Sequence, residues 1–313
     1  MRILEVLSEN KYISGNEIGK ALGISRAAVH KQVKNLISNG YVIVSSCKGY
    51  KLVKNSYIFN VNEMMTCLNC GVSVCSTIKH YKRINSTQIK IKQLAEAGAP
   101  EGLVVFADEQ SSAYGRMKRQ WSSEKGGMWF SVLLKPRVRP DEAPKLALLA
   151  SIAVRRVFCN SYGIMADIKW PNDVLFDDRK ICGIIIEMSA EQDIVNWIAA
   201  GIGININNKL SRDLENEAVS LKEITGESVN LSEFTAFFFN EFQNVYTEFQ
   251  KDGFGKFINE YNEYLAFKGE NIKIDDGYDI ISGVNEGINE SGYLKVKTNN
   301  GIRNIVSGTL RRS

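Results

Sequence analysis

The hydrophobic residues of the first sixty positions recur at a helical spacing and then in alternation. Ser14 and Glu17 form a capping-box pattern ahead of the second apolar stretch, and Gly23 supplies a tight turn after it. Ser25 then caps a longer helix, and two alternating apolar runs follow that helix as a hairpin. The predicted helices and the hairpin cover residues 2–8, 14–22, 25–39 and 40–53. This order of elements predicts a winged helix-turn-helix domain.

Residues 64–265 alternate between apolar strand-like runs and amphipathic helical runs. Strands are predicted over residues 72–81, 103–106, 128–134, 181–187 and 194–206. Helices are predicted over residues 88–97, 143–158 and 231–250. We therefore expect an α+β domain whose mixed sheet is covered by helices.

Short alternating runs fill the end of the chain, with Asp276-Gly277 and Asn300-Gly301 as turn signals. The predicted strands cover residues 268–274, 278–284, 292–298 and 302–307. Strands this short, joined by tight turns, predict a small SH3-like β-barrel.

Composition narrows the class of protein. Of the 313 residues, 44% are hydrophobic and 24% are charged, which is typical of a globular protein with two or three domains. No apolar run approaches the roughly 18 residues that span a bilayer, and the first residues lack a signal-peptide pattern. The six cysteines are scattered, without the spacing of a disulfide framework. We therefore expect a cytoplasmic protein with no membrane partner.

The charge is concentrated at one end. Residues 1–60 hold nine Lys and Arg and three acids, whereas the rest of the chain is nearly neutral. One face of the third predicted helix is polar and basic, and the hairpin tip adds a lysine. The predicted DNA-binding residues are Ser25, Arg26, Ala27, His30, Lys31, Lys34 and Lys48. This pattern favours a polyanion such as DNA, and the alternatives are a solubilising face or a winged helix used for protein contacts.

A possible zinc pattern is weighed against the predicted strand. Cys67, Cys70, Cys75 and His80 have spacing similar to that of a zinc knuckle. Cys75 and His80 lie five positions apart on the strand predicted over residues 72–81, so their side chains would point to opposite faces. We therefore predict no metal ligands in this chain.

Two cationic segments lie in the central domain. The rare string from Lys169 to Asp173 contains Trp-Pro-Asn, and Lys180 and Gly183 follow it at the start of an apolar run. A polar loop over residues 110–121 carries three cations and a glycine between two predicted strands. Backbone amides and cations in such a loop can neutralise a phosphate. The two segments together predict a site for an anionic ligand.

In their order and spacing these segments resemble the bifunctional biotin protein ligase and biotin operon repressor family, and the resemblance covers the whole chain. It implies a winged helix-turn-helix domain over residues 1–63, a class II synthetase-like catalytic domain over 64–266 and an SH3-like domain over 267–313. It implies that Lys180 and Arg116 are catalytic. The implied biotin-binding residues are Ser86, Thr87, Gln88, Gln110, Ala113, Tyr114, Gly115, Arg116, Lys180 and Gly183. The implied nucleotide-binding residues are Arg116, Arg119, Trp121, Lys169, Asn172, Asp173, Lys180 and Asn205.

The resemblance also implies a reaction and its partners. ATP with Mg²⁺ would activate biotin as biotinyl-5′-AMP, and a lysine of a biotin carboxyl carrier domain would accept the biotin. Arg116 and Lys180 would offset the repulsion between the biotin carboxylate and the α-phosphate. Biotinyl-5′-AMP would also act as corepressor, favouring a homodimer that binds operator DNA and represses biotin genes.

The loop departs from the family pattern, which leaves alternatives open. The family loop usually reads Gly-Arg-Gly-Arg-x-Gly-Arg, whereas Ala113, Tyr114 and Lys118 replace two glycines and one arginine here. Gln88 also stands where the family usually has Asn. The alternatives are a repressor that senses biotin without transferring it, and a ligase for lipoate or octanoate. Arg116 and Lys180 are retained, which favours ligation over sensing. The Lys169 to Asp173 string and the N-terminal domain argue against a ligase for lipoate or octanoate.

Overall fold

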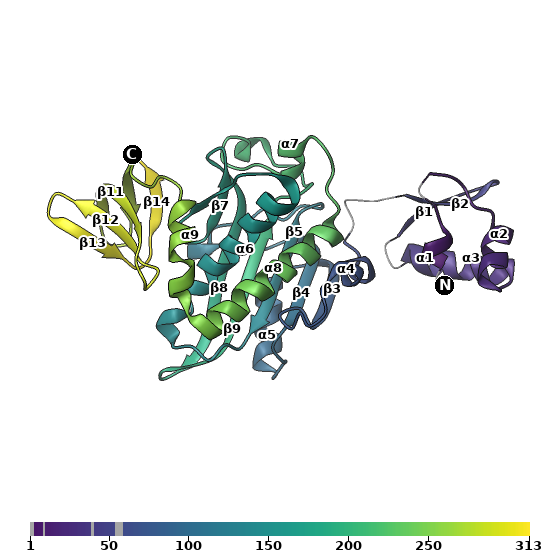
Figure 1. Ribbon diagram of the computed structural model, residues 1–313, viewed down its shortest axis with the longest axis horizontal. Helices are drawn as coiled ribbons and strands as arrows, with labels where there is room; N and C mark the ends of the chain where they lie inside the picture. Colours follow the sequence, from purple (N-terminus) through teal and green to yellow (C-terminus); the bar gives the residue numbers. More distant parts are fainter. Residues whose placement is uncertain (1–2, 9, 39–40, 54–58) are drawn as a thin grey trace.

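The computed structural model describes residues 3–8, 10–38, 41–53 and 59–313, and it divides into three parts along its longest axis (Figure 1). A winged helix-turn-helix domain lies at one end, a helix-covered sheet in the middle and a small β-sheet domain at the other end. Within the described residues, no helix combines the length and apolar character needed to cross a bilayer.

The N-terminal domain contains the elements that the sequence predicts. Its helices and strands are α1 (Ile3–Val6), α2 (Gly15–Leu22), α3 (Arg26–Ser38), β1 (Val42–Ser46) and β2 (Gly49–Val53). The capping box is present, because the Ser14 amide donates to Glu17 at 2.8 Å and the Glu17 amide donates to Ser14 Oγ at 3.2 Å. Gly23 takes the left-handed conformation at φ 67° and ends α2. The predicted element ends at residues 2, 39 and 40 lie outside the described residues.

A seven-stranded mixed sheet forms the central domain, with strand order β3-β4-β5-β9-β8-β7-β6. Strands β3 and β4 are parallel, and the other neighbouring pairs are antiparallel. The strands are β3 (Thr77–Ile84), β4 (Leu103–Gln110), β5 (Met128–Leu134), β6 (Asp167–Lys169), β7 (Asp173–Phe176), β8 (Arg179–Glu191) and β9 (Ile194–Ile204). The prediction of an α+β domain on a mixed sheet is therefore confirmed.

Helices cover the sheet and close its core. The helices are α4 (Val61–Cys67), α5 (Thr87–Glu96), α6 (Lys145–Tyr162), α7 (Leu221–Thr225), α8 (Leu231–Asp252) and α9 (Ile258–Glu263). Helices α6 and α8 run side by side across one face of the sheet (Figure 1). Their apolar side chains join those of the strands in one large buried cluster. Helix α5 packs on β4, β5 and β9 around a second, smaller cluster that includes Ile91 and Leu133.

The start of one strand and several short elements differ from the predictions. The strand predicted to start at residue 72 begins at Thr77, because Val74 and Cys75 are buried in the turn that precedes it. The sequence analysis did not predict α4, α7, α9, β6 or β7. Strands β6 and β7 form a hairpin whose turn is Trp170, Pro171 and Asn172. The Trp-Pro-Asn segment is thus the tip of a hairpin at the edge of the sheet.

The C-terminal domain is a five-stranded antiparallel sheet with strand order β13-β12-β11-β10-β14. Its strands are β10 (Asn271–Asp275), β11 (Ile280–Ile288), β12 (Leu294–Thr298), β13 (Gly301–Ile305) and β14 (Thr309–Arg312). The first strand starts at Asn271 and not at the predicted Lys268, and β14 was not predicted. Trp170 Nε1 donates to the Gly292 carbonyl at 3.0 Å, which ties this domain to the β6–β7 hairpin.

Candidate functional site

Two cavities lie side by side at the end of the central sheet, and the indole of Trp121 lines both of them. The larger cavity has a volume of about 300 Å³, and the smaller cavity has a volume of about 40 Å³. The indole lies against Gly183 and Gly203, which pair with each other across β8 and β9. A Cβ atom at Gly203 would come within 2.7 Å of Trp121 Nε1. The two glycines therefore provide the flat floor on which this indole lies.

Four cations line the larger cavity: Arg116, Arg119, Lys169 and Lys180. Burial lowers the pKa of Arg116 and that of Lys169, although Asp173 partly offsets both shifts. Lys180 Nζ lies 2.7 Å from Asp173 Oδ1, and the Asp173 side chain is 19% exposed. This excess of cations over acids in a partly buried cavity fits a ligand with several negative charges.

Asn172 and Asp173 of the β6–β7 hairpin contact two of these four cations. The side-chain nitrogen Nδ2 of Asn172 donates to the Ile184 carbonyl at 2.7 Å, which fixes the side chain against β8. The side-chain oxygen Oδ1 of Asn172 accepts a hydrogen bond from Arg116 Nη1 at 3.1 Å. The hairpin therefore positions one cation through Asn172 and another through Asp173.

The C-terminal domain completes the larger cavity. Arg116 donates to the Gly308 carbonyl at 3.3 Å and to Ser307 Oγ at 3.2 Å. Arg119 donates to Thr309 Oγ1 at 3.3 Å. These contacts join the loop over residues 111–121 to the segment between β13 and β14 and to the first residue of β14. No local pattern in the sequence predicts these contacts, because the partners lie 190 to 192 positions away.

The far side of the larger cavity is built around the backbone of Lys180. Its amide donates to the Glu217 carbonyl at 2.8 Å, and the Val219 amide donates to its carbonyl at 3.1 Å. Asn205 Nδ2 lies 3.4 Å from the same carbonyl. Leu210, Leu214 and Ala218 add apolar surface there. This wall has an apolar area that suits a planar ring, and the Asn205 side chain provides polar groups beside that area.

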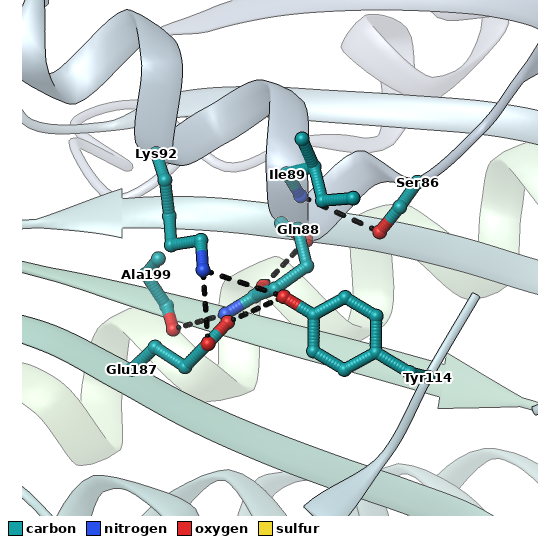
Figure 2. A network of polar contacts seen from close by, with 8 residues as sticks. Ser86, Gln88, Ile89, Lys92, Tyr114, Glu187 and Ala199 are labelled. Atoms are coloured by element: carbon teal, nitrogen blue, oxygen red, sulfur yellow. Dashed lines mark hydrogen bonds and ion pairs between the residues drawn. The ribbon is translucent and has the colours of Figure 1, made fainter. Parts of the chain in front are cut away.

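Polar side chains from α5 and two strands line the smaller cavity. Gln110 Oε1 accepts from the Thr87 amide at 2.7 Å, and Thr87 Oγ1 lies 2.9 Å from Ser131 Oγ. Gln88 Nε2 donates to the Ala199 carbonyl at 2.9 Å, a contact drawn in Figure 2. Ser86 caps α5 at the same end. These groups offer hydrogen-bond donors and acceptors to a small neutral polar ligand.

The structure brings the predicted site residues together in two groups. The predicted biotin residues that line the smaller cavity are Ser86, Thr87, Gln88, Gln110, Ala113, Tyr114 and Gly183. The predicted residues that line the larger cavity are Gly115, Arg116, Arg119, Trp121, Lys169, Asn172, Asp173, Lys180 and Asn205. Gly115, Arg116 and Lys180, predicted for biotin, thus lie on the larger cavity. Ser131 was missed, because a serine inside an apolar strand carries no functional signal of its own.

The predicted DNA-binding residues lie on α3, at the residue before it and at the turn of the hairpin. Ser25, Arg26, Ala27, His30, Lys31, Lys34 and Lys48 are all exposed. His30 Nδ1 lies 3.0 Å from Tyr50 Oη, which links the third helix to the hairpin. Of the residues weighed for zinc, Cys75 is buried, which raises its pKa to about 12, and His80 pairs with Asp108 at 2.7 Å.

Comparisons with known proteins cover the whole chain. Residues 80–205 match the Biotin/lipoate A/B protein ligase family, residues 1–51 match an HTH domain and residues 268–309 match the Biotin protein ligase C terminal domain. The bifunctional ligase/repressor BirA of Bacillus subtilis is 35% identical, over 98% of this chain and 97% of its own length. BirA of Escherichia coli is 24% identical over 99% of this chain and 96% of its own length.

One solved structure is similar to most of the chain. A biotin protein ligase from Aquifex aeolicus, in complex with biotin and ATP, has a TM-score of 0.68 and 30% sequence identity. The match covers 76% of this chain and 100% of the Aquifex chain.

Proposed function

The chain belongs to the family of bifunctional biotin ligase/repressors, and we propose that its two cavities hold biotin and ATP side by side. It is a biotin–protein ligase that also carries a DNA-binding domain, as its full-length relatives and its three matched domains indicate. The position of Trp121 carries the two-cavity assignment. This residue lines both cavities, so ligands in the two would meet at its edge.

The smaller cavity is the proposed site of the biotin ring system. Ser86, Thr87, Gln88 and Gln110 supply donors and acceptors that suit a cyclic urea. Ala113 and Gly183 add close, uncharged surface beside them. The ring system would therefore be recognised by hydrogen bonds and shape, with its carboxylate arm directed past Trp121 to the larger cavity.

The larger cavity is the proposed site of ATP and of the first reaction. The biotin carboxylate attacks the α-phosphorus, the bond to the bridging oxygen breaks, and pyrophosphate leaves. Two anions must approach one another in this step. Lys180 and Arg116 offset their repulsion and stabilise the charge on the α-phosphoryl oxygens. Asp173 orients the Lys180 ammonium through their ion pair.

The second reaction transfers biotin to protein. The amine of an acceptor lysine on a biotin carboxyl carrier domain attacks the acyl carbon of biotinyl-5′-AMP. An amide forms, AMP leaves with the bonding electron pair, and the amine loses a proton. No nucleophile of the enzyme is required, which suits a site whose polar side chains are mainly cations and amides.

Magnesium is proposed to enter with the triphosphate. Among the described residues, no group of three or more His, Cys, Asp or Glu is placed to hold a metal ion. Asp173 faces the larger cavity but is paired with Lys180. Mg²⁺ often keeps most of its ligands from phosphates and water, and there it would shield the pyrophosphate charge.

The N-terminal domain is proposed to bind operator DNA as a homodimer, with biotinyl-5′-AMP as corepressor. The exposed cations Arg26, Lys31 and Lys34 on α3 and Lys48 at the hairpin tip suit phosphates and base edges. We also propose a cytoplasmic location, where ATP, the acceptor and DNA are all present. Domain limits of 1–63, 64–266 and 267–313 remain part of this proposal.

Intact-mass analysis tests the ligase directly. A biotin carboxyl carrier domain is incubated with the full chain, biotin, ATP and magnesium, beside the Lys180→Ala variant. We expect a biotin-sized mass gain that the variant lacks. Biotin binding without transfer would identify a sensor, and a gain with lipoate or octanoate alone would identify the other ligase. Retardation of operator DNA only in the presence of biotin and ATP tests the repressor.

A further inference from the structure

One exposed side chain of α3 is held by the hairpin that follows this helix. Val29 and Val33 lie on the buried face of α3. His30 and Lys31 lie outside that face and are exposed. The ring nitrogen Nδ1 of His30 lies 3.0 Å from Tyr50 Oη of β2. One nitrogen of the imidazole is therefore occupied within the domain, and Nε2 is the nitrogen that can contact an external partner.

Tyr50 is itself anchored on two other elements. Its backbone pairs with Ser45 of β1, and it exchanges two hydrogen bonds of 2.9 Å with the backbone of Ile13. The Tyr50 ring lies against Gly15 at the start of α2, where an added Cβ atom would be 3.5 Å from Cε2. The hydroxyl group therefore orients the imidazole of His30 from a fixed point.

The same hydrogen bond determines which ring nitrogen carries a proton. An imidazole nitrogen is a stronger acceptor than a phenol oxygen, because the lone pair of the phenol is delocalised into its ring. Tyr50 Oη therefore donates to Nδ1, and the proton of the neutral imidazole lies on Nε2. A protonated imidazole carries a proton on Nε2 as well. In both charge states Nε2 of His30 is a hydrogen-bond donor.

A single donor at this position distinguishes between bases. The first turns of a recognition helix lie against base edges in the major groove, and His30 is the fifth residue of α3. In that groove guanine presents two acceptors, N7 and O6. Adenine presents one acceptor beside an amino group, thymine presents one acceptor beside a methyl group, and cytosine presents a donor. An N–H donor therefore favours guanine.

We propose that His30 reads the sequence of the operator, donating from Nε2 to a guanine in each half-site, and that Tyr50 is its positioning residue. The proposal rests on the proposed function, since it requires α3 to enter the major groove of operator DNA. Lys31 and Lys34 have a different role, because an ammonium group on a flexible stem suits phosphates, which carry no sequence information. The oriented imidazole supplies selectivity, and the lysines supply affinity.

Selection from random DNA duplexes tests the role of His30. The full chain is mixed with biotin, ATP, magnesium and the duplexes, and the bound DNA is sequenced. In each half-site we expect one guanine that the wild type prefers and that His30→Ala does not. Titrations of this duplex, and of one with adenine in place of that guanine, should show a preference of about tenfold in the wild type. In His30→Ala the two affinities should be equal.

Lys34→Ala is the matched control on the same helix. It should weaken binding to both duplexes equally and reduce the dependence of affinity on salt, because it removes a phosphate contact. The same equal weakening in His30→Ala would overturn the proposal. Loss of a preference for a base other than guanine would also overturn it, because Nε2 would then not be the donor.

A double-mutant cycle tests the role of Tyr50. Tyr50→Phe keeps the packed ring and removes the hydroxyl group, so it should reduce the guanine preference to about threefold and leave the other base preferences intact. The double variant should match His30→Ala. Weaker preferences at every position would indicate a damaged domain and would refute the positioning role. Tyr278→Phe makes the same chemical change at a side chain that is 97% exposed in the C-terminal domain, and it should change no preference.

The wild-type protein separates this proposal from the proposed function. If the wild type selects an operator and His30→Ala selects the same operator with the same preferences, only the role of His30 is refuted. If the wild type binds and selects no DNA, the proposed repressor function is refuted as well.

Discussion

Gly203 gives the most direct test of how the two cavities are built, because the indole of Trp121 lies on its backbone. An added Cβ atom would lie 2.7 Å from Trp121 Nε1, 2.8 Å from Cε2 and 3.0 Å from Cζ2. Attractive contacts between such atoms begin near 3.5 Å. Gly203→Ala therefore forces the indole to rise by about 0.7 Å or more. Since Trp121 lines both cavities, the displaced ring narrows them.

The expected magnitude follows from the cost of overpacking. An extra methyl group in a well-packed site costs about 1–3 kcal/mol. If the whole cost falls on biotin binding, the dissociation constant for biotin rises by between about fivefold and about 150-fold. Isothermal titration calorimetry with biotin measures the change in the dissociation constant. Thermal unfolding measures the part of the overpacking cost that lowers the stability of the fold.

Gly115→Ala is the matched control, because it adds the same methyl group elsewhere in the site. The nearest atom to a Cβ at Gly115 is the Arg119 carbonyl oxygen at 3.9 Å, and its φ of −101° suits any residue. We expect wild-type biotin binding from this variant. Wild-type affinity and stability in Gly203→Ala, or an equal loss in Gly115→Ala, would refute the packing argument.

Three further predictions concern the cation, the DNA-binding domain and pH. Lys180→Ala should slow adenylate formation by about 10²- to 10³-fold, measured as pyrophosphate release, because the ammonium stabilises the transition state. Biotin affinity, measured by calorimetry, should change far less. An equal loss of rate and of affinity would contradict a transition-state role. Ser14→Ala removes the cap of α2 and should lower stability by about 1 kcal/mol in denaturant unfolding, and no loss would contradict the cap. Glu187, with its pKa lowered, contributes stability above its ordinary pKa of 4.5 that is lost as the pH falls through the lower folded value. Lys92, with its pKa raised, contributes stability below its ordinary pKa of 10.5 that is lost as the pH rises through the higher folded value. The Lys92–Glu187 pair should therefore add a constant amount to the free energy of unfolding between about pH 6 and pH 9, and a pH dependence in that range that Glu187→Gln removes would contradict the pairing.

The loop departures show how a local pattern can be informative and still incomplete. Lys118 stands where the family usually has glycine, and it adopts φ 58°, in the left-handed region that glycine favours. The sequence analysis identified this position as a departure from the family pattern. It did not foresee that Tyr114 would bond to Glu187, because the partner lies on a strand 73 positions away.

Long regular elements were predicted well, and short ones were missed. Strand β5 was predicted with its observed bounds, because six of its seven residues are apolar and two glycines precede them as a turn signal. Strand β6 has three residues and β14 has four, so neither shows a period that pattern reasoning can detect. Both short strands form only because neighbouring strands pair with them.

The sequence by itself determined the order of the domains, the helix-turn-helix and the two cationic segments, because each depends on residues close together in the chain. Capping, periodicity and a contiguous string such as Lys169 to Asp173 are local properties. Only the tertiary structure decided that Gly183 would face Gly203 under Trp121, that Ser307 and Gly308 would hold Arg116, and how the cations would be shared between cavities. These contacts depend on strand register and domain packing, which arise from the burial of many side chains at once.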